Sequence, residues 1–128
     1  MPKARQLIVA CENRPGTLAE VAKVLGDAKV NILSCLTTTS GTQGQTHLVV
    51  DNVNRAKKAL AAARLSYTEA DVLQIELPNK PGKLGEFAGK LAAKGINISL
   101  GYHTSVKGSG KASLVLSVSD LDKAARIR

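Results

Sequence analysis

Two short turns of nearly identical sequence carry the residues best suited to binding a small ligand. Each has the pattern Asn-x-Pro-Gly, at residues 13–16 and 79–82, and each is followed by apolar residues at helical spacing. A turn that opens directly into a helix leaves backbone N–H groups unpaired at the positive end of the helix dipole, where a carboxylate can bind. Glycine has no Cβ to block that approach, and an asparagine side chain offers both a donor and an acceptor. These turns therefore predict sites for a small zwitterion or carboxylate.

Each of these residues also has a purely structural interpretation. Asparagine before Pro-Gly is a common turn residue, and asparagine before a strand often bonds to the local backbone. Arg14 and Lys80 add positive charge at the two turns, but a basic residue at a turn tip is equally typical of a solvated surface. Both interpretations stay open at the level of sequence.

No other group of residues has the spacing of a catalytic or metal site. His47 and His103 have no set of ligand residues at metal-binding spacing around them. Cys11 points to the same side of its strand as Leu7 and Val9 and is expected to be a buried, unreactive thiol, whereas Cys35 is expected on the opposite face of its sheet. We therefore predict no catalytic residue, no metal and no cofactor.

The composition is that of a packed protein with a basic surface. The chain has 128 residues, of which 44% are hydrophobic, and a net charge of +8. That charge favours acidic partners, but the basic residues are scattered and only three residues are aromatic, so nucleic acid is not expected as a partner. The longest apolar run near the N-terminus, Leu7 to Cys11, is too short for a membrane span or a secretory signal. We expect a cytoplasmic protein without a membrane segment.

The chain is an internal repeat. A shift of 66 residues aligns residues 7–62 with residues 73–128 without a gap, and sixteen of the 56 pairs are identical. Average residue frequencies would give about three or four identities. The two copies therefore predict the same structure twice.

Each copy shows the element order strand, helix, strand, strand, helix, strand. Apolar residues alternate from Leu7 and Leu73, and apolar residues at helical spacing begin at Leu18 and Leu84. Thr17 and Glu20 are expected to form a capping box, which Lys83 cannot form in the second copy. Tyr102 shares its alternation with Ile98 and Leu100 and is expected to face the helices. The later elements are expected as second strands to about Thr38 and Thr104, turns at 41–44 and 107–110, third strands at 46–50 and 112–118, helices from Asn52 or Asn54 to Arg64 and from Ser119 or Asp120, and a fourth strand at 66–70.

This order predicts an α+β protein of two ferredoxin-like units, residues 1–71 and 72–128, with antiparallel sheets packed side by side. Each unit is near the lower size limit for an independent core, so the pair should share a core or a sheet. Arg128 aligns with Ala62, so the second unit is expected to lack its last strand. Either the C-terminus is incomplete, which we favour, or a second subunit supplies the strand, because an exposed edge invites pairing.

The paired motifs resemble the ACT domain family, in particular small stand-alone proteins with two ACT repeats. A strand leads into Asn-x-Pro-Gly-x-Leu and, one helix later, into Asn-Ile, at the same spacing in both copies. The resemblance implies regulatory binding of an amino acid between two ACT units, without catalysis. Carried over, it implies that the turn asparagines orient the ligand, the glycines admit its approach and the asparagines of the Asn-Ile pairs come from the facing unit. The candidate ligand-binding residues are Asn13, Arg14, Gly16, Thr17, Leu18, Asn31, Asn79, Gly82, Lys83, Leu84 and Asn97.

Two hypotheses about function follow. The first is a non-enzymatic amino-acid sensor, a homodimer that acts on a separate enzyme or transporter; if only one turn binds, we expect the one with Asn13, Gly16 and Thr17. The second is an assembly module, linked to a protein or a nucleic acid, that keeps the ACT scaffold without a ligand. The charge of +8 and the unfinished second unit motivate the alternative.

Overall fold

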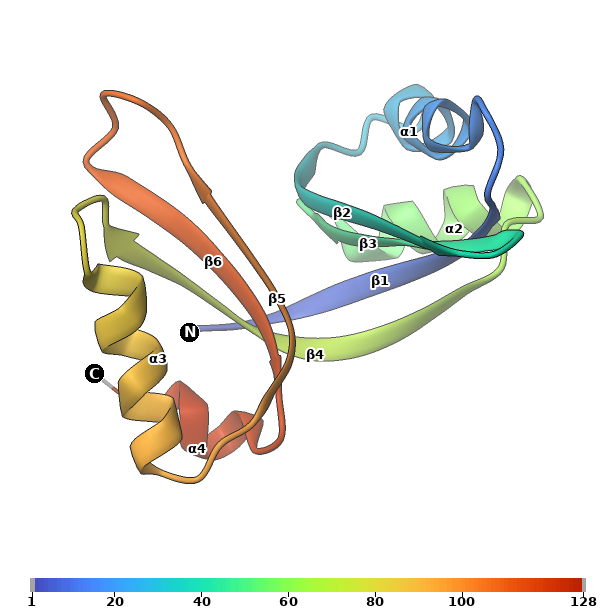
Figure 1. Ribbon diagram of the computed structural model, residues 1–128. Helices are drawn as coiled ribbons and strands as arrows, with labels where there is room; N and C mark the ends of the chain where they lie inside the picture. The colour runs from blue at the N-terminus through green and yellow to red at the C-terminus, as the bar shows by residue number, and fades with distance from the viewer. Residues whose placement is uncertain (1, 128) are drawn as a thin grey trace. The chain divides into compact units, whose positions relative to one another are not determined.

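The computed structural model describes residues 2–127, which form six strands and four helices (Figure 1). These residues divide into two compact units. The first unit comprises residues 5–70, and the second comprises residues 2–4 together with residues 71–127. Each unit has the ferredoxin-like arrangement that the repeat predicts.

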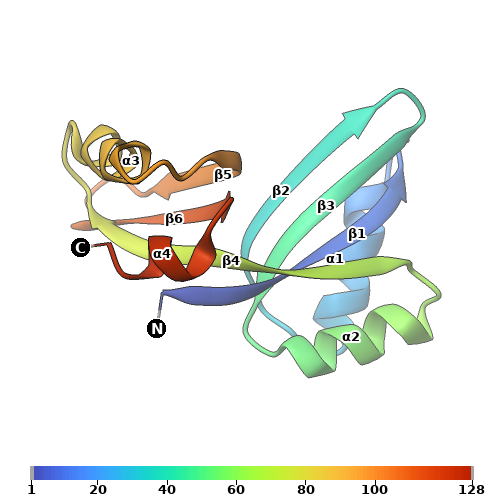
Figure 2. The same cartoon turned by 90° about the horizontal axis from the view of Figure 1, so that it is seen from below.

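In the first unit the strands lie in the order β2-β3-β1-β4, and both helices cover the same face of the sheet (Figure 2). Strand β1 pairs antiparallel with β3, which pairs antiparallel with β2. Asn52 caps α2 as predicted, its side chain accepting a hydrogen bond from the N–H of Arg55. The elements are β1 (Lys3–Glu12), α1 (Thr17–Asp27), β2 (Ile32–Ser40), β3 (Gln43–Val50), α2 (Val53–Ala62) and β4 (Tyr67–Pro78).

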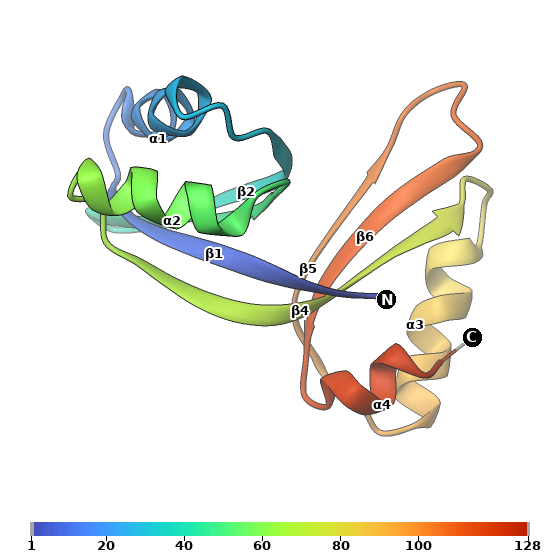
Figure 3. The ribbon, with the colours of Figure 1, turned by 180° about the vertical axis from the view of Figure 1, so that it is seen from behind.

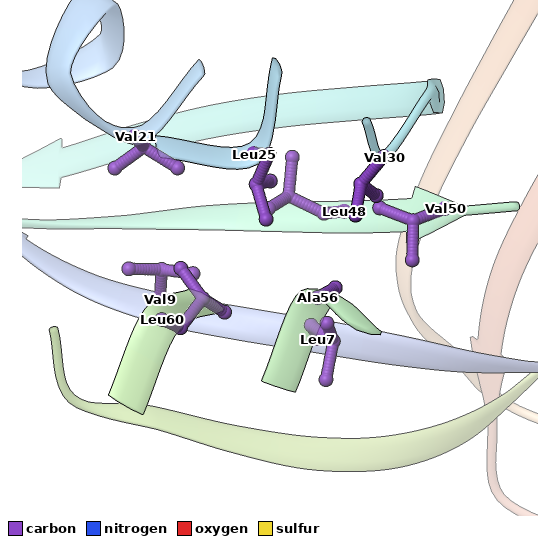
Figure 4. Packing of buried hydrophobic residues seen from close by; sticks show 9 residues of the cluster. All are labelled: Leu7, Val9, Val21, Leu25, Val30, Leu48, Val50, Ala56 and Leu60. Atoms are coloured by element: carbon purple, nitrogen blue, oxygen red, sulfur yellow. The ribbon is translucent and has the colours of Figure 1, made fainter. Parts of the chain in front are cut away.

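The core of the first unit lies between this sheet and its two helices (Figure 4). Leu7 and Val9 of β1 alternate into it, as the period of two predicts, and both are fully buried. Leu25 of α1 and Leu60 of α2 meet them from the helix side. Truncating such a residue to alanine typically costs about 2–5 kcal/mol.

The second unit repeats this layout with β4 in the place of β1. Its strands lie in the order β1-β4-β6-β5, with only the beginning of β1 included, and α3 and α4 lie on one face (Figures 1 and 3). Leu73, Phe87 and Leu91 form its core with Leu114 and Leu116. The further elements are α3 (Lys83–Ala93), β5 (Ile98–Ser105), β6 (Lys111–Val118) and α4 (Leu121–Ala125).

The start of β1 takes the place of a fourth strand in the second unit. The described chain has no strand after α4, as expected, but β1 lies beside β4 (Figure 3). The N–H of Gln74 donates to the carbonyl of Pro2 at 2.6 Å, and Lys3 pairs with Asp122 of α4. Because β4 continues without a break from the first unit into the second, the two strands predicted near residues 66–78 are one strand. The edge of β4 that was expected to be exposed is therefore paired with the start of β1.

A β-bulge at the start of β2, and an equivalent one in β5, overturns two predictions of side-chain direction. Cys35 lies opposite Leu48, a core residue, and therefore shares the sheet face of the helices. Tyr102 lies opposite Val115, which alternates with the core residues on either side of it, so Tyr102 faces away from the helices. Both predictions were wrong because the extra residue of a bulge shifts the alternation by one.

The ungapped alignment of the two copies is also wrong beyond the β2–β3 hairpin. Leu7 lies opposite Leu48, whereas the equivalent Leu73 lies opposite Leu116, so the true shift there is 68 residues rather than 66. The loop between β5 and β6 has five residues and that between β2 and β3 has two, but β5 is one residue shorter than β2, so the second hairpin contains a net insertion of two residues. Strands of alternating apolar residues match almost equally well in registers two residues apart, which hid the insertion. Gly44, expected in the turn, lies in β3.

None of the helices within residues 2–127 is both long enough and apolar enough to span a membrane.

Candidate functional site

Both Pro-Gly turns end in a glycine with a left-handed backbone. Gly16 has φ of 90° and Gly82 has φ of 87°, and each is the N-cap residue of the following helix. Other residues rarely adopt this conformation, so the turn itself requires glycine. No atom lies within 4 Å of the position that a Cβ would take at either residue. The backbone of both turns is therefore open to a ligand.

The first helix begins without the predicted capping box. Thr17 lies inside α1, and its hydroxyl donates back to the carbonyls of Glu12, at 2.9 Å, and Arg14, at 3.1 Å. No side chain caps the helix, and within residues 2–127 the N–H groups of Leu18 and Ala19 have no hydrogen-bond acceptor. The turn pattern predicts such unpaired N–H groups at the start of the helix, where an anion can bind.

The turn asparagines hold the hairpins. The Nδ2 of Asn13 donates to the carbonyl of Gly41 at 2.9 Å, and its backbone N–H donates to the carbonyl of Thr42 at 2.9 Å. Asn79 has the same role in the second unit. Its Nδ2 donates to the carbonyl of Ser109 at 2.9 Å, and its backbone N–H donates to the carbonyl of Gly110 at 3.0 Å. The donor of each side chain is therefore engaged, and only the Oδ1 acceptor of Asn13 and Asn79 has no partner in the described chain.

The asparagines before β2 and β5 have the opposite arrangement. The backbone N–H of Asn31 donates to the carboxylate of Asp51 at 2.9 Å, and that of Asn97 donates to the Ser119 hydroxyl at 2.9 Å. Neither side-chain amide forms a hydrogen bond with any described residue. Asn13 and Asn31 lie beyond opposite ends of α1, whose 11 residues span about 16 Å. One unit therefore does not bring the two asparagines together.

A small pocket lies beside the first turn, entirely within the first unit. Its volume is about 190 Å³, and it contains two of the predicted residues, Arg14 and Thr17. It also contains two carboxylates that we did not predict, Glu12 and Glu20, and apolar side chains that include Val21 and Leu65. The sequence signal for Glu20 is its spacing from Thr17, which predicts a capping box and not a place in a pocket.

Arg14 is held between the two carboxylates of this pocket. Its Nε lies 3.2 Å from Glu12, and its Nη2 lies 3.2 Å from Glu20. The hydrogen bond to Glu20, and next that to Glu12, raises the pKa of Arg14 above its ordinary value. One cation thus faces two anions, and the pocket presents negative as well as positive charge to a ligand.

The second turn differs in charge from the first. Lys83 lies 3.3 Å from Glu86, the equivalent of Glu20, and Lys80 replaces Arg14. Leu18 and Leu84, one at each turn, are 48% and 42% exposed and lie outside the cores. Both turns therefore present an apolar side chain, but only the first has a cation shared by two carboxylates among the pairs in residues 2–127.

The histidines and cysteines form no further site. No group of three or more histidine, cysteine, aspartate or glutamate residues in the described chain is placed to hold a metal ion. His47 is largely buried, and burial lowers its pKa. Cys11 is half-buried beside Thr46, with its Sγ 4.0 Å from the hydroxyl.

Comparison with known proteins extends over nearly the whole chain. A family profile described as the ACT domain pair matches residues 3–127. The structure is similar to that of a protein from Bacteroides thetaiotaomicron, with 30% sequence identity, a TM-score of 0.90, and coverage of 97% of this chain and 85% of that one. A search of curated proteins found no match.

Two regulatory subunits of aspartate kinase share the fold. The ligand-free subunit from Thermus thermophilus has 17% identity and a TM-score of 0.70, over 98% of this chain and 89% of that one. The subunit from Thermus flavus has 17% identity and a TM-score of 0.65, over 91% of this chain and 83% of that one.

Proposed function

Because the chain belongs to the ACT domain pair family, we propose that it is a regulatory protein, without catalytic activity, that binds an amino acid beside its first Asn-x-Pro-Gly turn. The observation that carries this proposal is the pocket in which Arg14 lies between Glu12 and Glu20, next to the open start of α1. It combines, within one small space, groups that suit both ends of a zwitterion.

The charges and the size of the pocket favour an amino acid over a simple anion. A carboxylate alone would face two carboxylates and one guanidinium, whereas an amino acid also brings an ammonium group to pair with Glu20. Its carboxylate would accept hydrogen bonds from the N–H groups of Leu18 and Ala19. The volume of about 190 Å³ is below the ~300–1,000 Å³ usual for drug-sized ligands.

The partners of the protein follow from the same proposal. We expect the ligand site to be completed by Asn31 or Asn97 of a facing unit, with Asn79, Gly82, Lys83 and Leu84 forming a second site of different charge. The two Thermus proteins are named as regulatory subunits of aspartate kinase, which supports a separate regulated enzyme or transporter as the partner of this protein. A homodimer in the cytoplasm is the expected form.

A thermal-shift screen of the twenty amino acids tests the proposal. A ligand at about 100 times its dissociation constant stabilises a folded protein by about 2.7 kcal/mol. Glu20→Gln should abolish the response because it removes the partner of the ligand's ammonium, while Glu86→Gln, the same change at the second turn, should leave it intact. The proposal would be contradicted if none of the twenty amino acids stabilised the protein. It would also be contradicted if Glu20→Gln and Glu86→Gln gave the same thermal shift with the ligand.

A further inference from the structure

The pocket beside the first turn has charged side chains at its mouth and apolar side chains farther in. The guanidinium of Arg14 and its two carboxylate partners are about half exposed or more. Val21, which also lines the pocket, is 1% exposed and points from α1 toward the sheet (Figure 4). Cys11 and Leu65 of the lining are partly buried. A ligand whose charged groups lie at the mouth therefore directs its remaining atoms toward these three side chains.

The repeat indicates which side chains leave this space open. Cys11 of β1 and Val21 of α1 are equivalent to Leu77 and Phe87 in the second unit, where the shift of 66 residues also relates the two helix starts. Phe87 belongs to the core of the second unit, and Leu77 packs against it. Both side chains are larger than their counterparts in the first unit. Two side chains of this size at Cys11 and Val21 would fill the space between β1 and α1.

The hydroxyl groups beside this space already have partners in the protein. The hydroxyl of Thr46 is fully buried and lies 4.0 Å from the Sγ of Cys11, and it forms a hydrogen bond of 3.0 Å with Thr37. The hydroxyl of Thr17, another lining residue, donates to two backbone carbonyls. A polar side chain of a ligand would have to compete with these hydrogen bonds or be buried without one, which costs free energy.

We propose that the ligand of this pocket is an amino acid with a short aliphatic side chain, such as valine or leucine, an inference that rests on the proposed function. With its ammonium at Glu20 and its carboxylate at the start of α1, the ligand places its side chain against Cys11, Val21 and Leu65. The volume of about 190 Å³ limits that side chain to a short one. A ligand with a side-chain carboxylate would be repelled by Glu12 and Glu20. Cys11 and Val21 thus determine the specificity of the site.

Calorimetric titration of the full chain with valine, leucine, threonine and phenylalanine tests this inference. Threonine has nearly the shape of valine but carries a hydroxyl, and phenylalanine tests the limit of size. We expect valine or leucine to bind about tenfold or more tightly than threonine and phenylalanine. An amino acid with a polar or aromatic side chain that bound as tightly as valine and leucine would overturn the inference and leave the proposed function in place. A lack of response to all twenty amino acids would overturn both.

Two variants exchange equivalent residues between the units. Cys11→Leu places the side chain of the second unit in the pocket, so leucine binding should weaken about tenfold or more while alanine binding changes less than about twofold. Leu77→Cys, the reverse change in the second unit, is the matched control and should change leucine binding less than about twofold. Undiminished leucine binding in Cys11→Leu, equal loss of leucine and alanine, or equal loss in both variants would overturn the role of Cys11.

Alkylation of the thiols in the unaltered chain provides a measurement that needs no variant. Leucine at about 100 times its dissociation constant should slow the reaction of Cys11 with iodoacetamide about tenfold or more, because the ligand covers the thiol. Cys35, an exposed thiol of β2, provides the internal control and should react at an unchanged rate. Mass spectrometry of the digested protein measures both rates. An equal rate at Cys11 with and without leucine would overturn the contact between the ligand and this side chain.

Discussion

At the first turn, Arg14 connects two carboxylates that come from different elements, Glu12 at the end of β1 and Glu20 in α1. All three side chains are about half exposed or more, so their mutual attraction adds little to stability. What the arrangement provides is a fixed pattern of charge at the mouth of a small pocket. This pattern of charge is the basis of the ligand binding that we propose.

The turn asparagines should contribute to stability, whereas the asparagines of the Asn-Ile pairs should not. Asn13→Ala removes the hydrogen bond to Gly41 and should lower the free energy of unfolding by about 1 kcal/mol. Asn31→Ala removes no side-chain hydrogen bond within the described chain and should change it by less than about 0.5 kcal/mol. Urea unfolding measures both, and equal effects would contradict the roles we assign.

Glu69 should make the first unit sensitive to acid. Its carboxylate lies 3.0 Å from Arg5 and 3.0 Å from Lys57, and these partners, Lys57 foremost, lower its pKa. A carboxyl whose pKa is lower in the folded state stabilises the protein above the unfolded-state value of about 4.3, and this contribution is lost as the pH falls through the folded value.

Glu69→Gln should therefore destabilise the protein at pH 7 and have a smaller effect at about pH 3. Urea unfolding at the two pH values measures this, with Glu76→Gln as a control because the one ion pair of Glu76 within residues 2–127 is with the exposed Lys111. A destabilisation that does not depend on pH would show that the ion pairs of Glu69 are unimportant.

At the scale of elements, β1 is the strand whose loss should matter most to the second unit. Removing residues 2–4 removes the hydrogen bond between Pro2 and Gln74 and the ion pair between Lys3 and Asp122. We expect faster hydrogen exchange in β4 beyond residue 72 and in α4, with little change in β3. Unchanged exchange in those segments would contradict a stabilising role for the N-terminal residues.

The order of elements could be predicted from the sequence because the repeat displays it twice. Alternation identified the inward residues of β1, and the caps Asn52 and Asp120 marked the starts of α2 and α4. The bulges could not be predicted, since neither Ile32 to Ser34 nor Ile98 to Leu100 contains glycine or proline as a signal. The one extra residue of each bulge places Cys35 and Tyr102 on the sheet faces opposite to those that the alternation predicts.

Only the backbone features of the candidate site could be predicted from the sequence. The left-handed glycines and the open helix starts follow from the Pro-Gly pattern. The roles of Glu12 and Glu20 do not, because they depend on Thr17 turning its hydroxyl back toward β1 rather than capping the helix. The engagement of Asn13 by Gly41 likewise depends on a hairpin 28 residues away.

At the scale of the whole molecule, two units of one fold carry different charges at their candidate sites. The first unit presents two carboxylates around Arg14, and the second turn presents Lys83 beside Glu86. Tyr102 faces away from the helices, but one aromatic side chain does not form a surface on which nucleic-acid bases stack. The other two aromatic residues, Tyr67 and Phe87, pack against the two cores. Ligand binding therefore explains more of the molecule than a nucleic-acid module does.

Self-association should accompany ligand binding if Asn31 or Asn97 completes the site from a second chain. Light scattering with size exclusion should give twice the chain mass of 13.4 kDa when a stabilising amino acid is present. Asn31→Ala with Asn97→Ala should weaken binding without unfolding the protein. A single-chain mass in the presence of saturating ligand would rule out a contribution from another chain.

Mapping of the binding site by NMR shows whether an amino acid binds beside the first turn. We would titrate ¹⁵N-labelled protein with the amino acid that gives the largest thermal shift and follow the backbone amide signals. We expect the largest changes at Gly16, Leu18, Ala19 and Glu20, whose N–H groups surround the open start of α1. Saturating changes confined to other parts of the chain, with residues 12–20 unaffected, would contradict it.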